Sequence, residues 1–233
     1  MMDPKRLLEQ MLGSDAAGGI RNAGQMAKDR LNRASGAEGF AGGAVVGGIL
    51  GLLLGGKVRR MAGGALGYGG AAVLGALAHR AYQNYQAGKS IDATVQATPV
   101  EIKEIPAAQL PHAEPATGGG SFELVLIEAM VAAAKADGHV DAEEQRRLFS
   151  EVERIGLDSE SKAYVFDLLS RPADPSQLGA KAATQEQAGE LYLASRLAID
   201  PDQPVERAYL DALAARLKLP AELRAHLDKQ ATG

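Results

Sequence analysis

Residues 39–56 read GFAGGAVVGGILGLLLGG, and residues 61–78 read MAGGALGYGGAAVLGALA. Glycine recurs at four-residue spacing in each run, with Ala71 in the register of the second, at Gly39, Gly43, Gly47, Gly51, Gly55, Gly63, Gly67 and Gly75. Each glycine costs a water-soluble helix roughly 1 kcal/mol relative to alanine. Helices in lipid, by contrast, associate through close backbone approach at small residues. The glycine ladder therefore predicts a membrane-inserted glycine zipper, with the lipid bilayer and further copies of the chain as its partners.

The two apolar runs, residues 40–56 and 61–78, are separated by a basic turn at residues 57–60. Each run is at the short end of the roughly 17–25 residues that cross a bilayer. Cations are costly at the bilayer centre, so the basic turn is expected at one membrane face. The simplest interpretation is a helical hairpin. The alternatives are a re-entrant hairpin, one spanning helix with one interfacial helix, and a soluble glycine-rich oligomerisation helix or disorder.

Charge divides the chain into two halves. Residues 1–120 carry 12 basic and 9 acidic side chains, and residues 121–233 carry 13 and 20, which together give the net charge of −4. A positive half suits an anionic lipid surface, whereas an acidic half argues against nucleic acid as a partner. The short flanks of the apolar runs carry more cations than the turn does, which favours a cytoplasmic C-terminal half. With no cysteine, disulfides, thiolate metal sites and cysteine catalysis are excluded.

The composition predicts four segments. Residues 1–38 form an amphipathic basic arm, either as a helix in the membrane interface or as a mobile segment. Residues 39–86 form the membrane segment, and residues 87–120, which contain four prolines, form a flexible linker. Residues 121–233 are long enough to bury one hydrophobic core. The predicted fold class is thus all-α, with a membrane hairpin, a linker and a compact bundle of about six or seven helices.

Local signals define most helices of the C-terminal bundle. Residues 124–134 are apolar on nearly every side, which predicts a central helix. Residues 158–170 predict another helix. Capping boxes at Asp174 and Thr184 mark two further helix starts, and the prolines at 204 and 220 mark two more.

An acidic stretch, Lys135-Ala136-Asp137-Gly138-His139-Val140-Asp141-Ala142-Glu143-Glu144, carries the most suggestive chemistry. Its second half matches a calcium-binding EF-hand loop. Its first half does not, because Ala133 and Lys135 occupy the first two ligand positions. The structural alternative is that Asp137 begins a turn, Asp141 caps a helix and Glu144 completes a capping box.

A second acidic connection, at residues 198–206, repeats the pattern of an acid, a turn, an apolar residue and a first-turn glutamate. If the two helix pairs pack face to face, six carboxylates converge, those of Asp137, Asp141, Glu144, Asp200, Asp202 and Glu206. Such a cluster would either bind a divalent cation, the one candidate cofactor, or present an acidic docking face to a protein partner.

The acidic motif resembles the signature of the tellurite-resistance TerB-like helical domain. The resemblance runs from Glu128-Ala129-Met130 through Asp137-Gly138-His139-Val140-Asp141 to Glu144, and residues 192–200 and 206–214 extend it. They are similar to a subgroup of bacterial inner-membrane proteins with a glycine-rich N-terminal segment. The resemblance implies an all-helical domain with an acidic, metal-binding face and a link to envelope or metal-oxyanion stress. It implies no catalytic activity, and tellurite resistance does not carry over to this subgroup.

Nothing in the sequence predicts an enzyme. The four histidines, at 79, 112, 139 and 226, show neither metal-ligand spacing nor a serine–histidine–acid arrangement. The leading hypothesis is a membrane-anchored interaction or sensing module of the bacterial envelope. The alternative is a membrane-active glycine-zipper protein that forms oligomers or remodels lipid under control of the helical domain. A hydrolase acting through the acid cluster stands third.

Overall fold

The computed structural model describes residues 3–12, 70–91, 105–136, 159–199, 201 and 203–231. Within these residues all regular structure is helical, which confirms the predicted all-α class. The α-helices are α1 (Pro4–Leu12), α5 (Gly70–Gln86), α7 (Phe122–Ala134), α9 (Ser159–Ser170), α10 (Pro175–Gly179), α11 (Gln185–Ala198), α12 (Pro204–Arg216) and α13 (Ala221–Ala231), and the 3-10 helices are η4 (Ala107–Gln109) and η5 (Pro111–Ala113).

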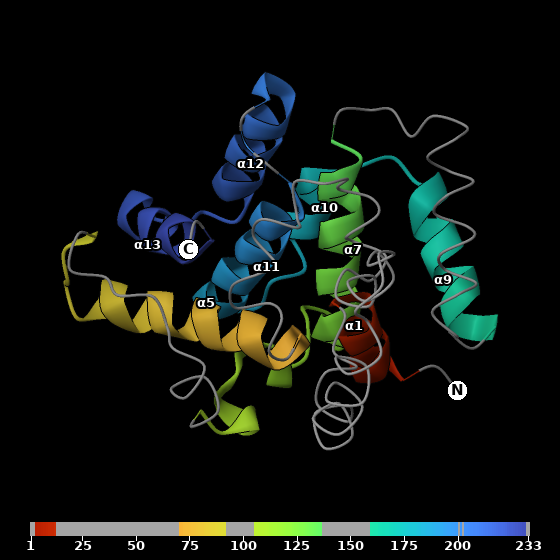
Figure 1. Ribbon diagram of the computed structural model, residues 1–233, viewed down its shortest axis with the longest axis horizontal. Coiled ribbons are helices and arrows are strands. Elements are labelled where there is room, and N and C mark those ends of the chain that lie inside the picture. The colour runs from red at the N-terminus through yellow and green to blue at the C-terminus, as the bar shows by residue number, and fades with distance from the viewer. Residues whose placement is uncertain are drawn as a thin grey trace, which may run out of the picture.

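Helices α7 and α11 form the centre of the domain (Figure 1). Helix α7 is buried along most of its length, as its apolar sequence predicts. Helix α11 packs against α7, α5 and α13, and its Leu191 and Tyr192 are completely buried. A helix that is buried on most sides can contact several neighbours, so α7 and α11 together organise the remaining helices.

Four predicted helix starts in the C-terminal half are confirmed, and the predicted start at Asp141 lies outside the described residues. The Asp174 side chain caps α10, and the Thr184 hydroxyl accepts a hydrogen bond of 3.1 Å from the backbone N–H of Gln187 in α11. Helix α12 begins at Pro204 and α13 begins directly after Pro220. These starts depend on residues close in sequence, which is why local patterns located them.

The structure corrects the predicted membrane helix over residues 61–78. Its described part belongs to α5, whose Leu74, Leu77 and Ala81 are buried against the helical domain. Helix α5 crosses the domain from α1 at one end to α13 at the other (Figure 1). A continuous apolar helix is compatible with a membrane and with a protein core, and here the core contains residues 74–81. Among the residues with described coordinates, no helix combines the length and the apolar character that crossing a bilayer requires.

The structure also corrects the predicted flexible linker over residues 105–120. This segment contains η4 and η5 and lies against α7 and α11, with Leu110 and Ala116 buried. The buried amide of Gln187 donates hydrogen bonds to the backbone carbonyls of Pro111, Glu114 and Pro115. The side chain of Gln187 on α11 thus supplies hydrogen bonds to carbonyls of this proline-rich segment. Residues 92–104 lie outside the described part of the chain.

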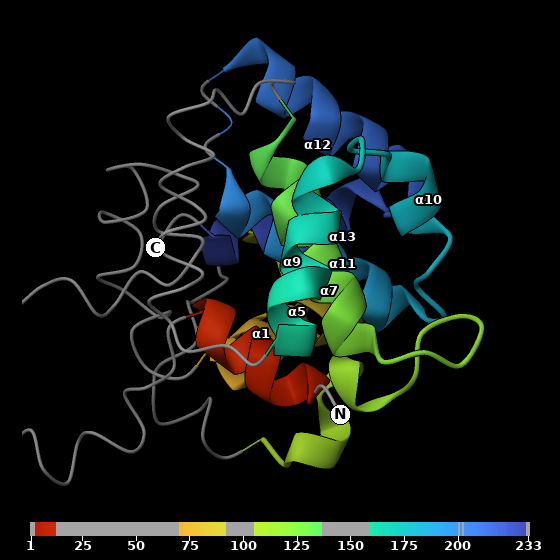
Figure 2. The same cartoon turned by 90° about the vertical axis from the view of Figure 1, so that its right-hand side faces the viewer.

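Helix α1 is part of the same core. It packs against α5 and α7 (Figure 2), and its Leu7 and Leu8 are buried. The sequence predicted that residues 1–38 form either a helix in the membrane interface or a mobile arm, and for residues 4–12 the structure differs from both predictions. The rest of the predicted arm and the first apolar run, residues 13–69, lie outside the described residues.

Candidate functional site

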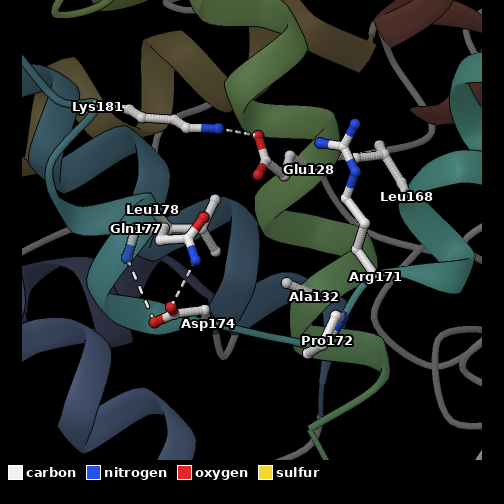
Figure 3. Close-up of a pocket in the computed structure, with 9 residues that line it drawn as sticks. All are labelled: Glu128, Ala132, Leu168, Arg171, Pro172, Asp174, Gln177, Leu178 and Lys181. Atoms are coloured by element: carbon white, nitrogen blue, oxygen red, sulfur yellow. Dashed lines mark hydrogen bonds and ion pairs between the residues drawn. The ribbon is translucent and has the colours of Figure 1, made fainter.

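A cleft of about 480 Å³ lies between α7, α9 and α10 (Figure 3). Apolar side chains and charged side chains both contribute to it. It is lined by Glu128, Ala132, Leu168, Arg171, Pro172, Asp174, Gln177, Leu178 and Lys181. Its volume falls in the range of roughly 300–1,000 Å³ that is typical of ligand pockets.

An ion pair between Glu128 and Lys181 forms one side of the cleft. Glu128 projects from α7, and Lys181 lies in the connection between α10 and α11. Both side chains are partly exposed, and Figure 3 shows them pointing toward each other. The pair joins the central helix to the opposite wall and leaves each charge largely neutralised by the other.

Asp174, on the opposite side of the cleft, is the N-cap of α10. Its carboxylate accepts hydrogen bonds of 2.8 Å from the backbone N–H of Ser176 and from the side-chain amide of Gln177. The backbone hydrogen bond from Ser176, followed by the bond from the Gln177 side chain, lowers the pKa of Asp174. Asp174 is therefore a carboxylate whose oxygens already have donors.

Arg171 is the most accessible charge of the cleft. Its side chain is 56% exposed and forms an ion pair with Asp167 one helical turn away. Exposed pairs of this kind contribute only about 0–1 kcal/mol. The Arg171 guanidinium can therefore exchange Asp167 for an incoming anion at little cost.

Lys135 sets the distance between α7 and α9. From the end of α7 its ammonium group donates hydrogen bonds to the carbonyls of Leu168, at 3.3 Å, Leu169, at 2.5 Å, and Arg171. These carbonyls end α9, where a cation also interacts favourably with the helix dipole. Partial burial lowers the pKa of Lys135. This structural role accounts for a lysine at a position where an EF-hand needs an oxygen ligand.

A second polar centre lies buried between η5, α5 and α11. His112 Nδ1 is 2.5 Å from Oε1 of Glu190, whose side chain is 0% exposed. Burial is the largest influence on the pKa of His112 and would lower it, but the hydrogen bond and the charge of Glu190 outweigh burial and raise it. Burial likewise raises the pKa of Glu190. The pair thus retains a proton more strongly than the two groups would in water.

Gly75 lies directly against this buried pair. A Cβ atom at residue 75 would be 2.6 Å from Cε1 of His112 and 3.2 Å from Oε1 of Glu190. This member of the glycine ladder therefore permits close approach within the helical domain. The other predicted helix-association residues lie outside the described residues, namely Gly39, Gly43, Gly47, Gly51, Gly55, Gly63 and Gly67.

Most of the predicted metal site also lies outside the described residues, at Asp137, Asp141, Glu144, Asp200 and Asp202. The sixth residue, Glu206, is in the first turn of α12 and is partly buried. Among the described residues, no three histidine or acidic side chains are grouped as metal ligands. The six-carboxylate site stays a prediction.

Sequence reasoning missed the cleft and the buried pair. Glu128 and Lys181 are 53 positions apart, and His112 and Glu190 are 78 apart, so no local spacing connects them. The one available signal was Glu190, an acid in the middle of an otherwise buried helical stretch.

A family model described as "Protein of unknown function (DUF533)" matches residues 39–231. DUF533 is related to TerB-like domains, in agreement with the resemblance seen in the sequence. The chain is also 34% identical over 99 residues to an uncharacterised protein in the ampR 5′ region of Yersinia enterocolitica; the match covers 42% of this chain and 71% of that protein. No solved structure matches the chain.

Proposed function

We propose that this chain, which belongs to the DUF533 family of proteins of unknown function, is a binding module attached to a bacterial inner membrane. Its cleft between α7, α9 and α10 would dock a partner polypeptide. The glycine-rich segment would attach the protein to lipid and bring copies together. The helical domain would act on the cytoplasmic side by binding rather than by catalysis. A role in envelope or metal-oxyanion stress is the biological setting that the TerB-like resemblance suggests.

The observation that carries this proposal is an accessible cation beside an apolar floor. Leu168, Leu178 and Ala132 supply apolar surface in the cleft, and Arg171 is exposed at its edge. Lys181 is already paired with Glu128. Of the two cations that line the cleft, Arg171 is therefore the one whose charge is readily available to a ligand.

This pattern fits a peptide segment with one apolar side chain next to a carboxylate. The apolar side chain would lie against the leucines, and the carboxylate would replace Asp167 as the partner of Arg171. Guanidinium groups bind carboxylates with two parallel hydrogen bonds, which gives such an exchange geometric specificity. Gln177 at the rim adds an amide that can bond to a peptide backbone.

Site-specific photocrosslinking in cells tests the docking site. A photoreactive residue at Gln177 should give a discrete covalent product with a partner, and the same residue at the exposed Glu222 on α13 should not. Arg171→Glu should reduce the product at least fivefold. The matched change Arg216→Glu, at the exposed end of α12, should leave it unchanged.

Two outcomes would reject the cleft as the docking site. One is an equal yield of products from the Gln177 and Glu222 positions. The other is a product that survives Arg171→Glu at full yield, because the proposed carboxylate would then have no role. Thermal denaturation of each variant shows whether a loss of product reflects unfolding.

Membrane attachment is tested separately by flotation. The full chain should float with liposomes that contain anionic lipid and should resist extraction at alkaline pH. The same chain without residues 39–60 should stay with the soluble fraction. Flotation of both proteins would assign lipid binding to another part of the chain.

A further inference from the structure

Helix α1 packs against both α5 and α7 (Figure 2), and the surface of these two helices that α1 covers is called the α5–α7 groove. Among the described side chains of α1, two adjacent ones are buried against the domain, Leu7 at 1% exposure and Leu8 at 0%. Asp3 caps the helix by accepting a hydrogen bond of 3.2 Å from the backbone N–H of Arg6. A helix of nine residues is too short to be stable alone in water. Helix α1 therefore depends on the groove for its own stability.

The contact has charges as well as apolar surface. Lys5 of α1 and Glu123 of α7 both lie close enough to His112 for their charges to act on it. Lys5 is on α1 and Glu123 is on α7, and these two helices are in contact. A helix with an adjacent leucine pair and a lysine two residues before it has the chemistry that this groove accepts.

Helix α1 is separated from the rest of the domain along the chain. Residues 13–69 lie between α1 and α5, and the DUF533 match begins only at residue 39. The entropic cost of closing a chain loop grows slowly with its length. A connection of this length does not dictate that α1 must bind the groove of its own chain.

We propose that the α5–α7 groove is an exchangeable helix-binding site that takes α1 from a second copy of this chain, so that associated copies swap their N-terminal helices. The proposal rests on the proposed self-association for what brings two copies together. Helix α1 makes the same contacts whether it binds its own chain or a second copy. Swapping it is therefore a low-cost route to a dimer. Association elsewhere in the chain raises the local concentration of the second α1.

Crosslinking between two distinguishable chains tests the swap. Because the sequence has no cysteine, Lys5→Cys can be placed in one chain and Glu123→Cys in a second chain of different tag size. A short bismaleimide should join the two chains into a covalent heterodimer. Leu7→Asp with Leu8→Asp in the Lys5→Cys chain should lower the yield at least tenfold. Sedimentation in detergent shows whether the two chains still associate.

A peptide of residues 1–14 provides a second test that needs no substitution in the core. Excess peptide should compete with α1 and lower the heterodimer yield by the same tenfold. The same peptide with Leu7→Asp and Leu8→Asp is the matched control and should have no effect.

Three results would overturn the swap. The first is associated chains that give no heterodimer, which leaves the proposed self-association intact. The second is a heterodimer whose yield is unchanged by the leucine substitutions and by the peptide. The third is chains that sediment as monomers and give no heterodimer, which would reject the proposed self-association as well.

Discussion

At the scale of single residues, Gly75 is a position where the missing side chain makes room for a neighbour. The His112 ring fills the space that a Cβ atom at residue 75 would need, and that ring is hydrogen-bonded to the buried Glu190. A helical glycine normally costs stability relative to alanine. At this position the close contact with His112 outweighs that cost.

Gly75→Ala should therefore destabilise the protein although it improves helix propensity. Overpacking typically costs about 1–3 kcal/mol, against a gain of about 1 kcal/mol from alanine, so we expect a net loss of up to about 2 kcal/mol in a chemical denaturation experiment. Gly189→Ala is the matched control. Its Cβ would make ordinary contacts of 3.6 and 3.7 Å with Leu227, so it should be neutral or stabilising. Equal effects of the two changes would contradict the close-packing role of Gly75.

The His112–Glu190 pair should make stability depend on pH. The pKa of each group is raised in the folded protein. A raised folded-state pKa gives stability that is complete below the unfolded-state pKa and is lost as pH rises through the folded-state pKa. For Glu190 this window begins near its ordinary value of 4.5, and for His112 near 6.5. The free energy of unfolding should therefore fall as pH rises above about 4.5, and fall further above about 6.5.

Other charged groups lie on the helices packed around this pair. They are Glu123 on α7, Lys5 on α1, and His79 and Glu186, which pair at 3.3 Å across α5 and α11. Glu190→Gln should remove the decrease and reverse the trend, because burial alone would then lower the pKa of His112. Glu186→Gln, on the same helix, is the control and should leave most of the decrease in place. Denaturation at several pH values measures both, and an unchanged profile in Glu190→Gln would rule out the pair as its source.

At the scale of elements, Gln187 holds a segment without regular structure against a helix. Its buried side-chain NH₂ group donates hydrogen bonds to three backbone carbonyls of residues 111–115. Its side-chain oxygen accepts a hydrogen bond of 2.8 Å from the backbone N–H of Ala183. One side chain thus attaches the proline-rich segment 105–120 to the first turn of α11. Two of the four prolines that suggested a linker in the sequence, Pro111 and Pro115, accept these bonds with their own carbonyls.

Gln187→Met keeps the side-chain length but removes its hydrogen bonds. Leaving buried carbonyls without donors costs about 1–3 kcal/mol, so we expect a loss of stability of this size. Hydrogen exchange should rise in residues 105–120 more than in α12. Gln185→Met, at an exposed position on the same turn, should change neither quantity. Uniformly faster exchange over the whole domain would show that Gln187 stabilises the fold without specifically holding the segment.

The sequence-based predictions were accurate where the interacting residues are close together in the sequence, and they failed where those residues are far apart in the sequence. Helix starts at Asp174 and Thr184 were predictable because a cap and the N–H that it binds are three residues apart or closer. Helix α5 was assigned to lipid because leucine and alanine residues fill a membrane helix and a core helix in the same pattern. The cleft could not be predicted, because Glu128 meets Lys181 only after α7 and α10 have packed.

At the scale of the whole molecule, the helical domain includes far more of the chain than residues 121–233. Helix α1, helix α5 and the segment 105–120 all contribute buried residues to one core. The family match from residue 39 to 231 agrees with a unit that extends well before residue 121.

Self-association should depend on the glycine ladder before residue 57. Gly47→Leu with Gly51→Leu should abolish association in detergent, because leucine side chains would keep the helix backbones apart. Gly48→Leu with Gly56→Leu makes the same chemical change outside the ladder register and should preserve most of it. Sedimentation equilibrium measures the difference. Unchanged oligomers in the ladder variant would remove the zipper hypothesis.

The start of α5 at Gly70 has a mechanical consequence. Only five residues separate Gly70 from Gly75, a distance of about 7.5 Å along a helix, and Gly75 touches the buried His112–Glu190 contact. A pull or a torque that reaches residue 70 therefore passes into the core through one continuous helix, without an intervening hinge. A contact that bears that load is a titratable pair, so mechanical stress on α5 and proton binding at His112–Glu190 act on the same few atoms.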